Sequence, residues 1–258
     1  MIIEKAHADD FEELKQLWSV VFDEEPAFLE HFFSKRFSSD HIVVAREDGT
    51  IVSALHALPC SYQQHGKIKP CAYIVGAATY QAYRKRGIMG KLLAYTKEAY
   101  TIPITLFPAV RPFYEANGYI TTSNMKEYAL TTQSGHDIES IPLSIEQLDE
   151  IFCKETAAEG ALLRDRLAWE SLLSGYELYA VKEGYALVKD HVAVETLASQ
   201  EHAAKELLQL LHNNHVKTCR IIPNTLMETQ FSEKPFTLVP MGMSTDTTMA
   251  GIYIAEQY

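Results

Sequence analysis

The stretch YIVGAATYQAYRKRGIMGKLLAYTKEAY, residues 73–100, predicts a buried strand, a basic turn and a helix in succession. Apolar residues run from Tyr73 to Ala78 with Gly76 among them, which is typical of a strand covered on both faces. From Leu92 to Tyr100 the apolar residues recur at helical spacing. We therefore expect the N-terminal half of the chain to be organised around this strand, turn and helix.

The turn combines basic side chains with glycines, which suits an anionic ligand. Gly87 and Gly90 carry no side chain, so a ligand can approach the backbone there. The first amides of a helix have no partner within it and lie at the positive end of its dipole. A phosphate or diphosphate therefore fits, with Arg84, Lys85 and Arg86 adding positive charge. The alternative is a solvated turn that only starts a helix, and the spacing matches neither a Walker loop nor a Rossmann fingerprint.

The composition is that of a globular protein. Of the 258 residues 47% are hydrophobic and 22% charged, and no apolar run reaches the roughly 18 residues that span a bilayer. The acidic N-terminus lacks the basic start and apolar core of a signal peptide, so we expect a cytoplasmic protein that does not act at a membrane. Four scattered cysteines form no CxxC pair, which fits reduced thiols and predicts no metal site.

Charge is distributed unevenly along the chain. Residues 1–135 carry 14 basic and 15 acidic side chains, whereas residues 136–258 carry 9 and 19. An acidic second half would repel phosphates, which argues against nucleic acid as a partner. It could attract a cationic substrate, although an acidic surface that only aids solubility explains the charge equally well.

Periodicity predicts the elements of the N-terminal half. Strands are expected at 2–5, 41–46, 51–62, 73–79 and 102–107. Helices are expected at 8–22, over the apolar stripes 28–33 and 92–100, and at 111–119. Residues 63–69 predict a polar turn, and residues 119–123 and 125–130 a closing pair of strands.

The second half repeats a similar order of elements. Helices are expected at 144–156, 162–174 and 201–212, and strands at 177–182, 185–189, 192–197, 217–222, 236–239 and 249–254, the last two as a pair. Residues 131–137 predict a linker, which suggests domains at 1–131 and 137–258. The second domain has Ser199-Gln200-Glu201-His202 where the first has its basic turn, so we expect no phosphate site there.

Two motifs in the first half resemble the GNAT superfamily of acetyl-CoA-dependent N-acyltransferases. Arg84-x-x-Gly87, opening a helix after a strand, is similar to that family's Gln/Arg-x-x-Gly-x-Gly/Ala turn, with Met89 departing from the pattern. Phe113-Tyr114-Glu115-Ala116-Asn117-Gly118-Tyr119 is similar to its Phe-Tyr-x-x-x-Gly-Phe/Tyr helix. The whole chain looks most like the enhanced-intracellular-survival acetyltransferases, which carry a second, degenerate domain of the same kind, and Arg164 and Trp169 fit that pattern.

The resemblance implies an α/β (α+β) fold of two tandem GNAT-like domains, the first catalytic and the second degenerate. Each would hold a mixed, mostly antiparallel sheet flanked by helices. The first sheet would open where the strand ending at Thr79 parts from the strand ending at Phe107. The cleft would hold acetyl-CoA as cosubstrate, without a metal. The residues expected to bind it are Ala77, Ala78, Thr79, Arg84, Lys85, Arg86, Gly87, Ile88, Met89 and Gly90.

The resemblance also implies catalytic roles. Tyr114 would protonate the departing thiolate, because its phenol has a reference pKa near ~10 and a thiol one near ~8.5; a core aromatic is the alternative. Glu24 and Glu25, in the turn between the first two helices, would attract the amine or accept its proton through water, unless they only form a solvated helix end. The Tyr258 carboxylate is a further candidate base by analogy with those relatives. His56, inside a strand, is better explained as a structural residue.

These observations favour an N-acetyltransferase that passes an acetyl group to a primary amine by direct attack on the thioester. A catalytically silent CoA-binding sensor or regulatory module is the alternative. Met89 favours this alternative, because its side chain could crowd the diphosphate. A third hypothesis is an interaction protein whose acidic half binds a basic partner. The acceptor would be a small-molecule or peptidic amine, and the oligomeric state is left open, a homo-oligomer included.

Overall fold

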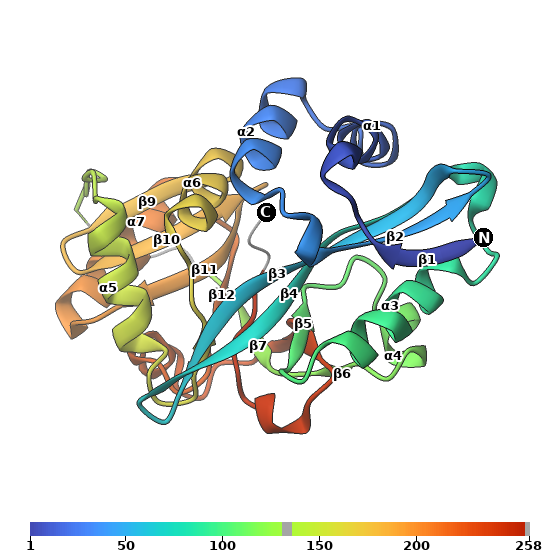
Figure 1. The fold of residues 1–258 in the computed structure, drawn as a ribbon. Helices are drawn as coiled ribbons and strands as arrows, with labels where there is room; N and C mark the ends of the chain where they lie inside the picture. The colour runs from blue at the N-terminus through green and yellow to red at the C-terminus, as the bar shows by residue number, and fades with distance from the viewer. Residues whose placement is uncertain (131–135, 256–258) are drawn as a thin grey trace. The chain divides into compact units, whose positions relative to one another are not determined.

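The computed structural model describes residues 1–130 and 136–255, and the chain forms two compact units. Unit 1 comprises Met1–Ser61, Pro70–Ile120 and Met243–Thr247. Unit 2 comprises Tyr62–Lys69, Thr121–Gly242 and the segment that starts at Thr248. Each unit holds a mixed sheet flanked by helices, so the predicted fold class is confirmed (Figure 1). Each is assembled from several segments of the chain, whereas the sequence suggested two continuous domains.

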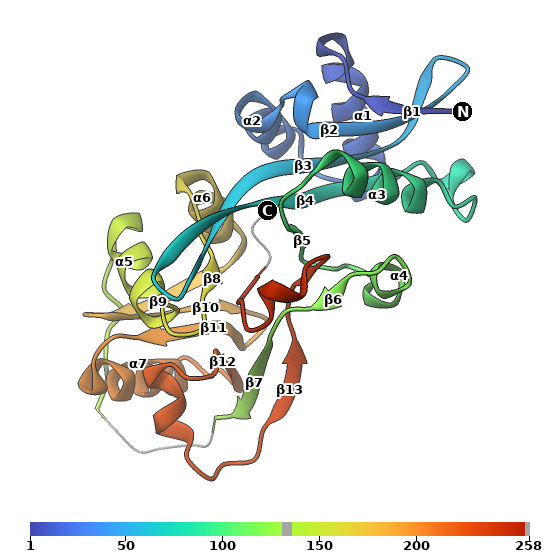
Figure 2. The same ribbon diagram turned by 60° about the horizontal axis from the view of Figure 1, so that its bottom comes forward.

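Unit 1 has a sheet of order β1-β2-β3-β4-β5-β14, in which β4 and β5 run parallel. Its strands are β1 (Ile2–Lys5), β2 (Ile42–Glu47), β3 (Thr50–Gln64), β4 (Lys67–Thr79), β5 (Ile104–Leu106) and β14 (Met243–Ser244), with β6 (Ile120–Thr121) at the end of the unit. Its helices are α1 (Phe11–Phe22), α2 (Pro26–Arg36), α3 (Ile88–Ala99) and α4 (Arg111–Ala116). Helices α1 and α2 cover one face of the sheet and α3 and α4 the other (Figures 1 and 2).

The core of unit 1 lies between the sheet and α3. Ile88, Leu92 and Leu93 of α3 are buried in one cluster with Ala72 and Ile74 of β4. These helix positions recur at the spacing of one helical face, which is why the sequence pattern located the helix correctly. The start of α3 is thereby held at the end of β4, where the basic turn joins them.

The hairpin between β3 and β4 is longer than expected. Residues 63–69 were expected to form a polar turn, but the turn consists only of His65 and Gly66, whose φ angles of 50° and 71° are left-handed. Two left-handed residues match the twist of the flanking strands. Polar side chains at positions 63, 64, 67 and 69 therefore continue the strands: position 67 is exposed, and the buried amide of Gln64 donates a hydrogen bond of 2.9 Å to the carbonyl of Thr248.

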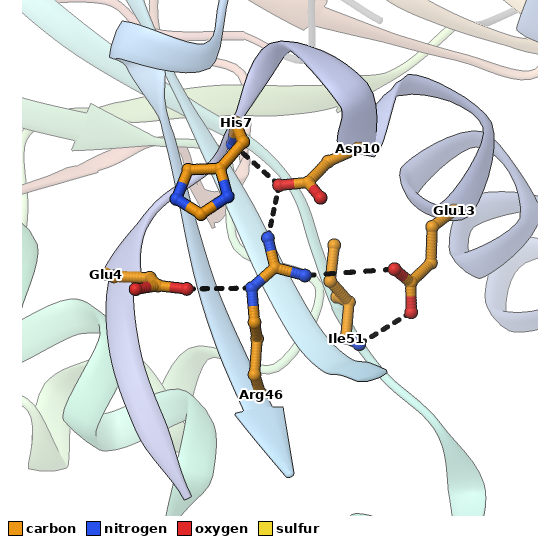
Figure 3. A network of polar contacts seen from close by, with 6 residues as sticks. All are labelled: Glu4, His7, Asp10, Glu13, Arg46 and Ile51. Carbon is orange, nitrogen blue, oxygen red and sulfur yellow. Dashed lines mark hydrogen bonds and ion pairs between the residues drawn. The ribbon is translucent and has the colours of Figure 1, made fainter. Parts of the chain in front are cut away.

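Arg46 on β2 joins three carboxylates from the N-terminal segment (Figure 3). Its guanidinium lies 2.8 Å from Glu4 on β1 and 3.8 Å from Glu13 on α1, and it donates a hydrogen bond to Asp10. Glu13 in turn accepts a hydrogen bond of 2.6 Å from the Ile51 amide. One mostly buried cation thus fixes the start of α1 to the edge of the sheet.

Replacing Arg46 by methionine is expected to destabilise unit 1 by about 2–3 kcal/mol, somewhat below the cost of breaking a fully buried ion pair. The reason is that three carboxylates would face one another without a counter-charge. Urea unfolding measures the change. Lys15→Met is the control, since Lys15 pairs with Glu12 and Glu30 at the surface, where solvent screens the charges, and its loss is expected to cost clearly less stability. Equal costs for the two variants would show that the Arg46 network adds nothing beyond a surface pair.

Unit 2 has a six-stranded sheet of order β13-β7-β12-β11-β10-β9, with only β11 and β12 parallel. Its strands are β7 (Asn124–Ala129), β8 (Ala161–Leu162), β9 (Glu177–Val181), β10 (Gly184–Lys189), β11 (Val192–Ala198), β12 (Thr218–Ile221) and β13 (Thr237–Pro240), and β8 pairs with Tyr62 and Gln63, the part of β3 that belongs to unit 2. Its helices are α5 (Ile145–Glu155), α6 (Arg166–Gly175) and α7 (Glu201–Asn213). Helices α5 and α6 cover one face of the sheet and α7 the other (Figure 2).

Two predicted strand pairs are wrong. Residues 119–123 and 125–130 do not pair with each other, because β7 pairs with β12 and β13. Residues 236–239 and 249–254 do not pair either: β13 joins β7, and residues 247–249 form a short 3-10 helix. Neighbouring apolar runs indicate strands but do not identify partners, since pairing depends on which edges the fold leaves available.

The starts of α6 and α7 can be compared with the helices expected in unit 2. The helix expected at 162–174 begins later, at Arg166, because the side chain of Asp165 caps it by accepting a hydrogen bond of 3.0 Å from the Ala168 amide. Helix α7 follows β11 and begins at Glu201, which makes its first turn acidic. Most of the expected linker, residues 131–135, lies outside the described residues.

Candidate active site

Strands β4 and β5 part within unit 1. Ala72, Tyr73 and Ile74 pair with residues 104–106, and β5 ends at Leu106 while β4 continues to Thr79. The last five residues of β4 therefore extend beyond the end of their neighbour. This is the opening that was expected between these strands, and it leaves backbone groups of β4 facing a gap.

The turn after β4 presents backbone amides without partners. Helix α3 begins at Ile88 and its N-cap is Gly87, which has a φ of 72° and supplies no side chain to cap the helix. The amides of residues 85–90 form no hydrogen bond with any part of the chain that the structure describes. A side-chain carbon at Gly87 would meet nothing within 4 Å. Such a helix start is suited to an anion.

The three basic residues of the turn differ in their surroundings. Arg84 donates from Nε to the carbonyl of Thr79 at 3.0 Å, so it fixes the turn to the end of β4. Arg86 pairs with Glu47 at 3.1 Å and lies over the ring of Tyr83. Lys85, with a left-handed φ of 61°, has no ion pair among the residues that the structure covers. Of the three, Arg86 therefore has its charge paired, whereas Arg84 and Lys85 form no ion pair among the described residues and both line the pocket described below.

A pocket of about 640 Å³ lies at the turn. Nine residues expected at the site line it: Ala77, Thr79, Arg84, Lys85, Gly87, Ile88, Met89, Gly90 and Tyr114. Ala78 and Arg86 do not: Ala78 is buried on the other side of β4, and its carbonyl accepts a hydrogen bond of 2.8 Å from Ser53, while Arg86 is drawn to Glu47. Met89 also packs against the core of the unit.

Tyr114 lies on α4 in the wall of this pocket. Its side chain is 8% exposed and its ring contacts those of Phe113 and Tyr119 edge-on. Burial raises the pKa of Tyr114 above its usual value. Its hydroxyl makes no hydrogen bond to another described residue. A protonated phenol with an available donor therefore borders the pocket, and this is the state a general acid requires.

The candidate bases lie elsewhere. Glu24 and Glu25 are exposed in the turn between α1 and α2, and neither lines the pocket. His56 is fully buried, and burial lowers its pKa to about 3, so it stays neutral. Tyr258 lies outside the described residues. The roles of Glu24 and Glu25 stay predictions, and the surroundings of His56 agree with a structural residue.

Six residues of the pocket wall were not expected from the sequence: Val21, Phe22, Tyr83, Ala109, Val110 and Phe113. Val21 and Phe22 are the last two residues of α1. Both remain partly accessible, because α1 stops at Asp23 in a left-handed conformation and leaves them at the rim. Phe113 precedes Tyr114 in its motif, and that position was the one available signal.

Residues 3–121 match the acetyltransferase (GNAT) domain family. They are a GNAT domain. The match includes the parted strands, the bare turn and Tyr114, and it covers most of unit 1. The GNAT family consists of acyltransferases, so this region is an acyltransferase domain. No curated protein matches the sequence significantly.

Solved structures extend the likeness to the whole chain. A probable N-acyltransferase of unknown function from Enterococcus faecalis has a TM-score of 0.70 at 21% identity, over 94% of this chain and 72% of that one. A GCN5-related N-acetyltransferase from Anabaena variabilis gives 0.69 at 16% over the same shares. Eis1 from Mycobacterium abscessus gives 0.65 at 15%, over 95% and 73%. The chain therefore has the fold of two tandem GNAT-like domains. No helix in residues 1–130 and 136–255 is long and apolar enough to cross a membrane.

Proposed function

We propose that the protein is an acetyl-CoA-dependent N-acetyltransferase that acetylates a primary amine by direct attack on the thioester. The observation that carries the proposal is the set of unpartnered amides at residues 85–90, which open α3 beside the pocket that Tyr114 lines. The GNAT family of residues 3–121 supports it. The acidic charge of the chain supports a cationic acceptor such as an amine.

The residues present fit acetyl-CoA. The amides of residues 85–90 and the ammonium of Lys85 would hold the diphosphate. The amides are hydrogen-bond donors at the positive end of the helix dipole, the ammonium is a full positive charge, and neither has a partner among the described residues. The backbone of Ala77 and Thr79, beyond the end of β5, would pair with the amides of the pantetheine arm. Apolar walls formed by Ile88, Met89 and neighbouring side chains would exclude water from the thioester.

The chemistry needs a neutral amine, a polarised carbonyl and a proton for the leaving group. The amine nitrogen bonds to the carbonyl carbon while a backbone amide of residues 77–79 stabilises the oxyanion, an interaction worth about 3–4 kcal/mol of barrier. The carbon–sulfur bond then breaks, and Tyr114 donates its proton to the thiolate. The amine's proton leaves through water, because no carboxylate in the described residues lines the pocket. Glu24 and Glu25 would attract the cationic acceptor at the rim beside Phe22.

A turnover screen tests the proposal. Acetyl-CoA consumption is measured with aminoglycosides, polyamines, amino acids and short peptides as acceptors. Turnover of any amine supports the transferase. Tight acetyl-CoA binding without turnover of any of these amines would favour the silent sensor instead, and neither binding nor turnover would refute both.

Gly87→Ala is expected to weaken acetyl-CoA binding roughly tenfold, about 1.4 kcal/mol. A methyl group there would stand in the open space that the diphosphate needs. In the wild type, acetyl-CoA at about 100 times its Kd is expected to stabilise the protein by about 2.7 kcal/mol, which raises Tm. Thermal unfolding with and without the ligand measures both effects.

Gly49→Ala is the matched control. Gly49 also has a left-handed φ, 84°, with nothing within 4 Å of the added carbon, but it lies in the β2–β3 turn and does not line the pocket. Both variants are expected to lose about 1–2 kcal/mol of stability through strain. Only Gly87→Ala is expected to lose affinity, and equal affinities would remove residues 85–90 from the binding site.

A further inference from the structure

Strand β4 contains an inserted residue at Gly76. Ala72, Ile74 and Ala77 all face the core beside α3, so their spacing changes from two residues to three. A strand keeps a spacing of two unless a bulge adds a residue. Gly76 has a left-handed φ of 61°, which identifies it as the irregular position. The bulge re-aims the residues that follow it, and Ala77 and Thr79 consequently line the pocket.

The indole of Trp18 on α1 occupies the space that a side chain at Gly76 would need. A carbon added there would lie 1.8 Å from Cζ2 and 2.2 Å from Cε2 of Trp18, and the three nearest atoms all belong to this ring. Such distances are far inside van der Waals contact. The ring therefore packs directly on the backbone of the bulge.

Trp18 is itself held rigidly. It is 3% exposed, and its ring contacts Phe32 at 4.7 Å, His56 at 5.0 Å and Phe33 at 5.3 Å between centroids. It also contacts Phe22, at 5.5 Å, which lines the pocket one helical turn further along α1. No described residue accepts a hydrogen bond from its indole nitrogen. Its position is thus set by packing alone, between an aromatic cluster and the bulge.

The strand after the bulge is held along its edge by β3. The hydroxyl of Ser53 donates to the carbonyl of Ala78 at 2.8 Å and lies 2.7 Å from the hydroxyl of Thr79. The amide of Tyr80 donates to the carbonyl of Val52 at 3.1 Å. Strand β5 pairs with β4 only as far as Ile74, so residues beyond it have no neighbour on that edge. The packing of Trp18 on Gly76 is therefore the second contact that restrains this segment.

We propose that Trp18 is a positioning residue for the transfer reaction. By packing on Gly76 it sets the direction of the bulge, and hence of the backbone amides of residues 77–79 that polarise the thioester. This inference rests on the proposed function. It explains why the indole packs against Gly76, although this contact requires a residue with a left-handed φ inside the strand.

The test compares Trp18→Phe with Phe11→Leu. Both change an aromatic residue of α1, but only Trp18 supplies the atoms nearest Gly76, whereas the ring contacts of Phe11 are with Phe33 and Phe37. Trp18→Phe is expected to lower kcat by about 10- to 100-fold, as a displacement of reacting groups by about 1 Å does. Acetyl-CoA affinity is expected to change less than about threefold, because residues 85–90 are untouched. Phe11→Leu is expected to lose stability and to keep kcat.

A double-mutant cycle and hydrogen exchange complete the test. Gly76→Ala is expected to be less harmful in the Trp18→Phe background than in the wild type, because the smaller ring leaves room for the added methyl. Amides 77–79 are expected to exchange faster in Trp18→Phe than in Phe11→Leu.

The outcomes separate this inference from the proposed function. A wild type that turns over an amine, with Trp18→Phe retaining its kcat and its exchange rates, would overturn the positioning role and leave the transferase intact. A wild type without turnover of any amine would overturn the transferase, while the exchange rates would still decide whether Trp18 orders residues 77–79.

Discussion

Replacing Tyr114 by phenylalanine is expected to lower kcat by about 10²- to 10⁴-fold, the contribution typical of a general acid. The substitution removes only the hydroxyl group, which has no hydrogen-bond partner among the described residues, and Tyr114 lines the pocket. Acetyl-CoA affinity is expected to stay nearly constant, because the ring that forms the wall is kept. Steady-state kinetics and calorimetric titration measure the two quantities.

The pH dependence gives a second readout for Tyr114. A general acid must be protonated, and burial raises the pKa of Tyr114 above its usual value near ~10. Activity is therefore expected to rise as the amine substrate deprotonates, and loss of the acid form is expected only above about pH 10.

Tyr119→Phe is the matched control for this prediction. Tyr119 contacts the Tyr114 ring at 5.8 Å, but its buried hydroxyl has no partner in the described residues and does not line the pocket. Its removal is expected to leave kcat and stability nearly unchanged. Comparable rates for Tyr114→Phe and the wild type would exclude Tyr114 as the acid.

Arg164→Met is expected to destabilise unit 2 by about 3–5 kcal/mol, the cost of leaving a buried charge unpaired. The side chains of Arg164 and Glu195 are 1% and 2% exposed and form two hydrogen bonds of 2.7 and 2.6 Å. The hydroxyls of Tyr185 and Tyr253 also donate to Glu195, each at 2.7 Å. Methionine would fill part of the volume and leave the carboxylate without its cation. Urea unfolding measures the loss.

The control is Arg166→Met, two residues away. Arg166 pairs with Glu170 at 2.9 Å and Glu146 at 3.6 Å, but its side chain is well exposed. Such pairs contribute at most about 1 kcal/mol. If Arg164→Met and Arg166→Met lost equal stability, the buried pair would contribute no more than a surface pair does.

The loss in Arg164→Met is also expected to depend on pH. Burial alone would raise the pKa of Glu195, but the charge and hydrogen bonds of Arg164 and the two tyrosine hydroxyls lower it overall. In the wild type this pair therefore stabilises the fold above the ordinary Glu pKa of about 4.3, and the contribution is lost as the pH falls through the lower folded value. In the variant, burial without Arg164 raises the pKa, so protonation of Glu195 relieves the unpaired charge. The difference in the free energy of unfolding between the wild type and Arg164→Met is therefore expected to become smaller as the pH falls from 7 to 4.

Local elements were predictable because each depends on neighbouring residues. The strand, turn and helix around Gly87 follow from an apolar run, a break in periodicity and a helical stripe within 28 residues. Strand partners were less predictable. Strand β13 has the composition of a strand, but its pairing with β7 links residues more than a hundred positions apart. No local pattern encodes that choice.

In the candidate site too, local features were predictable from the sequence and contacts between distant residues were not. Nine of its pocket residues were predicted. Seven of them belong to two local motifs, the helix start after the basic turn and the short helix with Tyr114, and the resemblance added Ala77 and Thr79 of the preceding strand. Glu24 and Glu25 were predicted from their turn, yet Val21 and Phe22 form that part of the wall. Helix periodicity gives the direction of a side chain but not what stands opposite it.

The sequence by itself determined that this chain has a bare, basic helix start after a buried strand, since backbone donors and glycine conformations are properties of adjacent residues. Only the tertiary structure decided that Arg86 pairs with Glu47 while Lys85 forms no ion pair within residues 1–130 and 136–255, and that Trp18 fills the space beside Gly76. The physical reason is that charge pairing and close packing act through space, between residues that the fold brings together from distant positions.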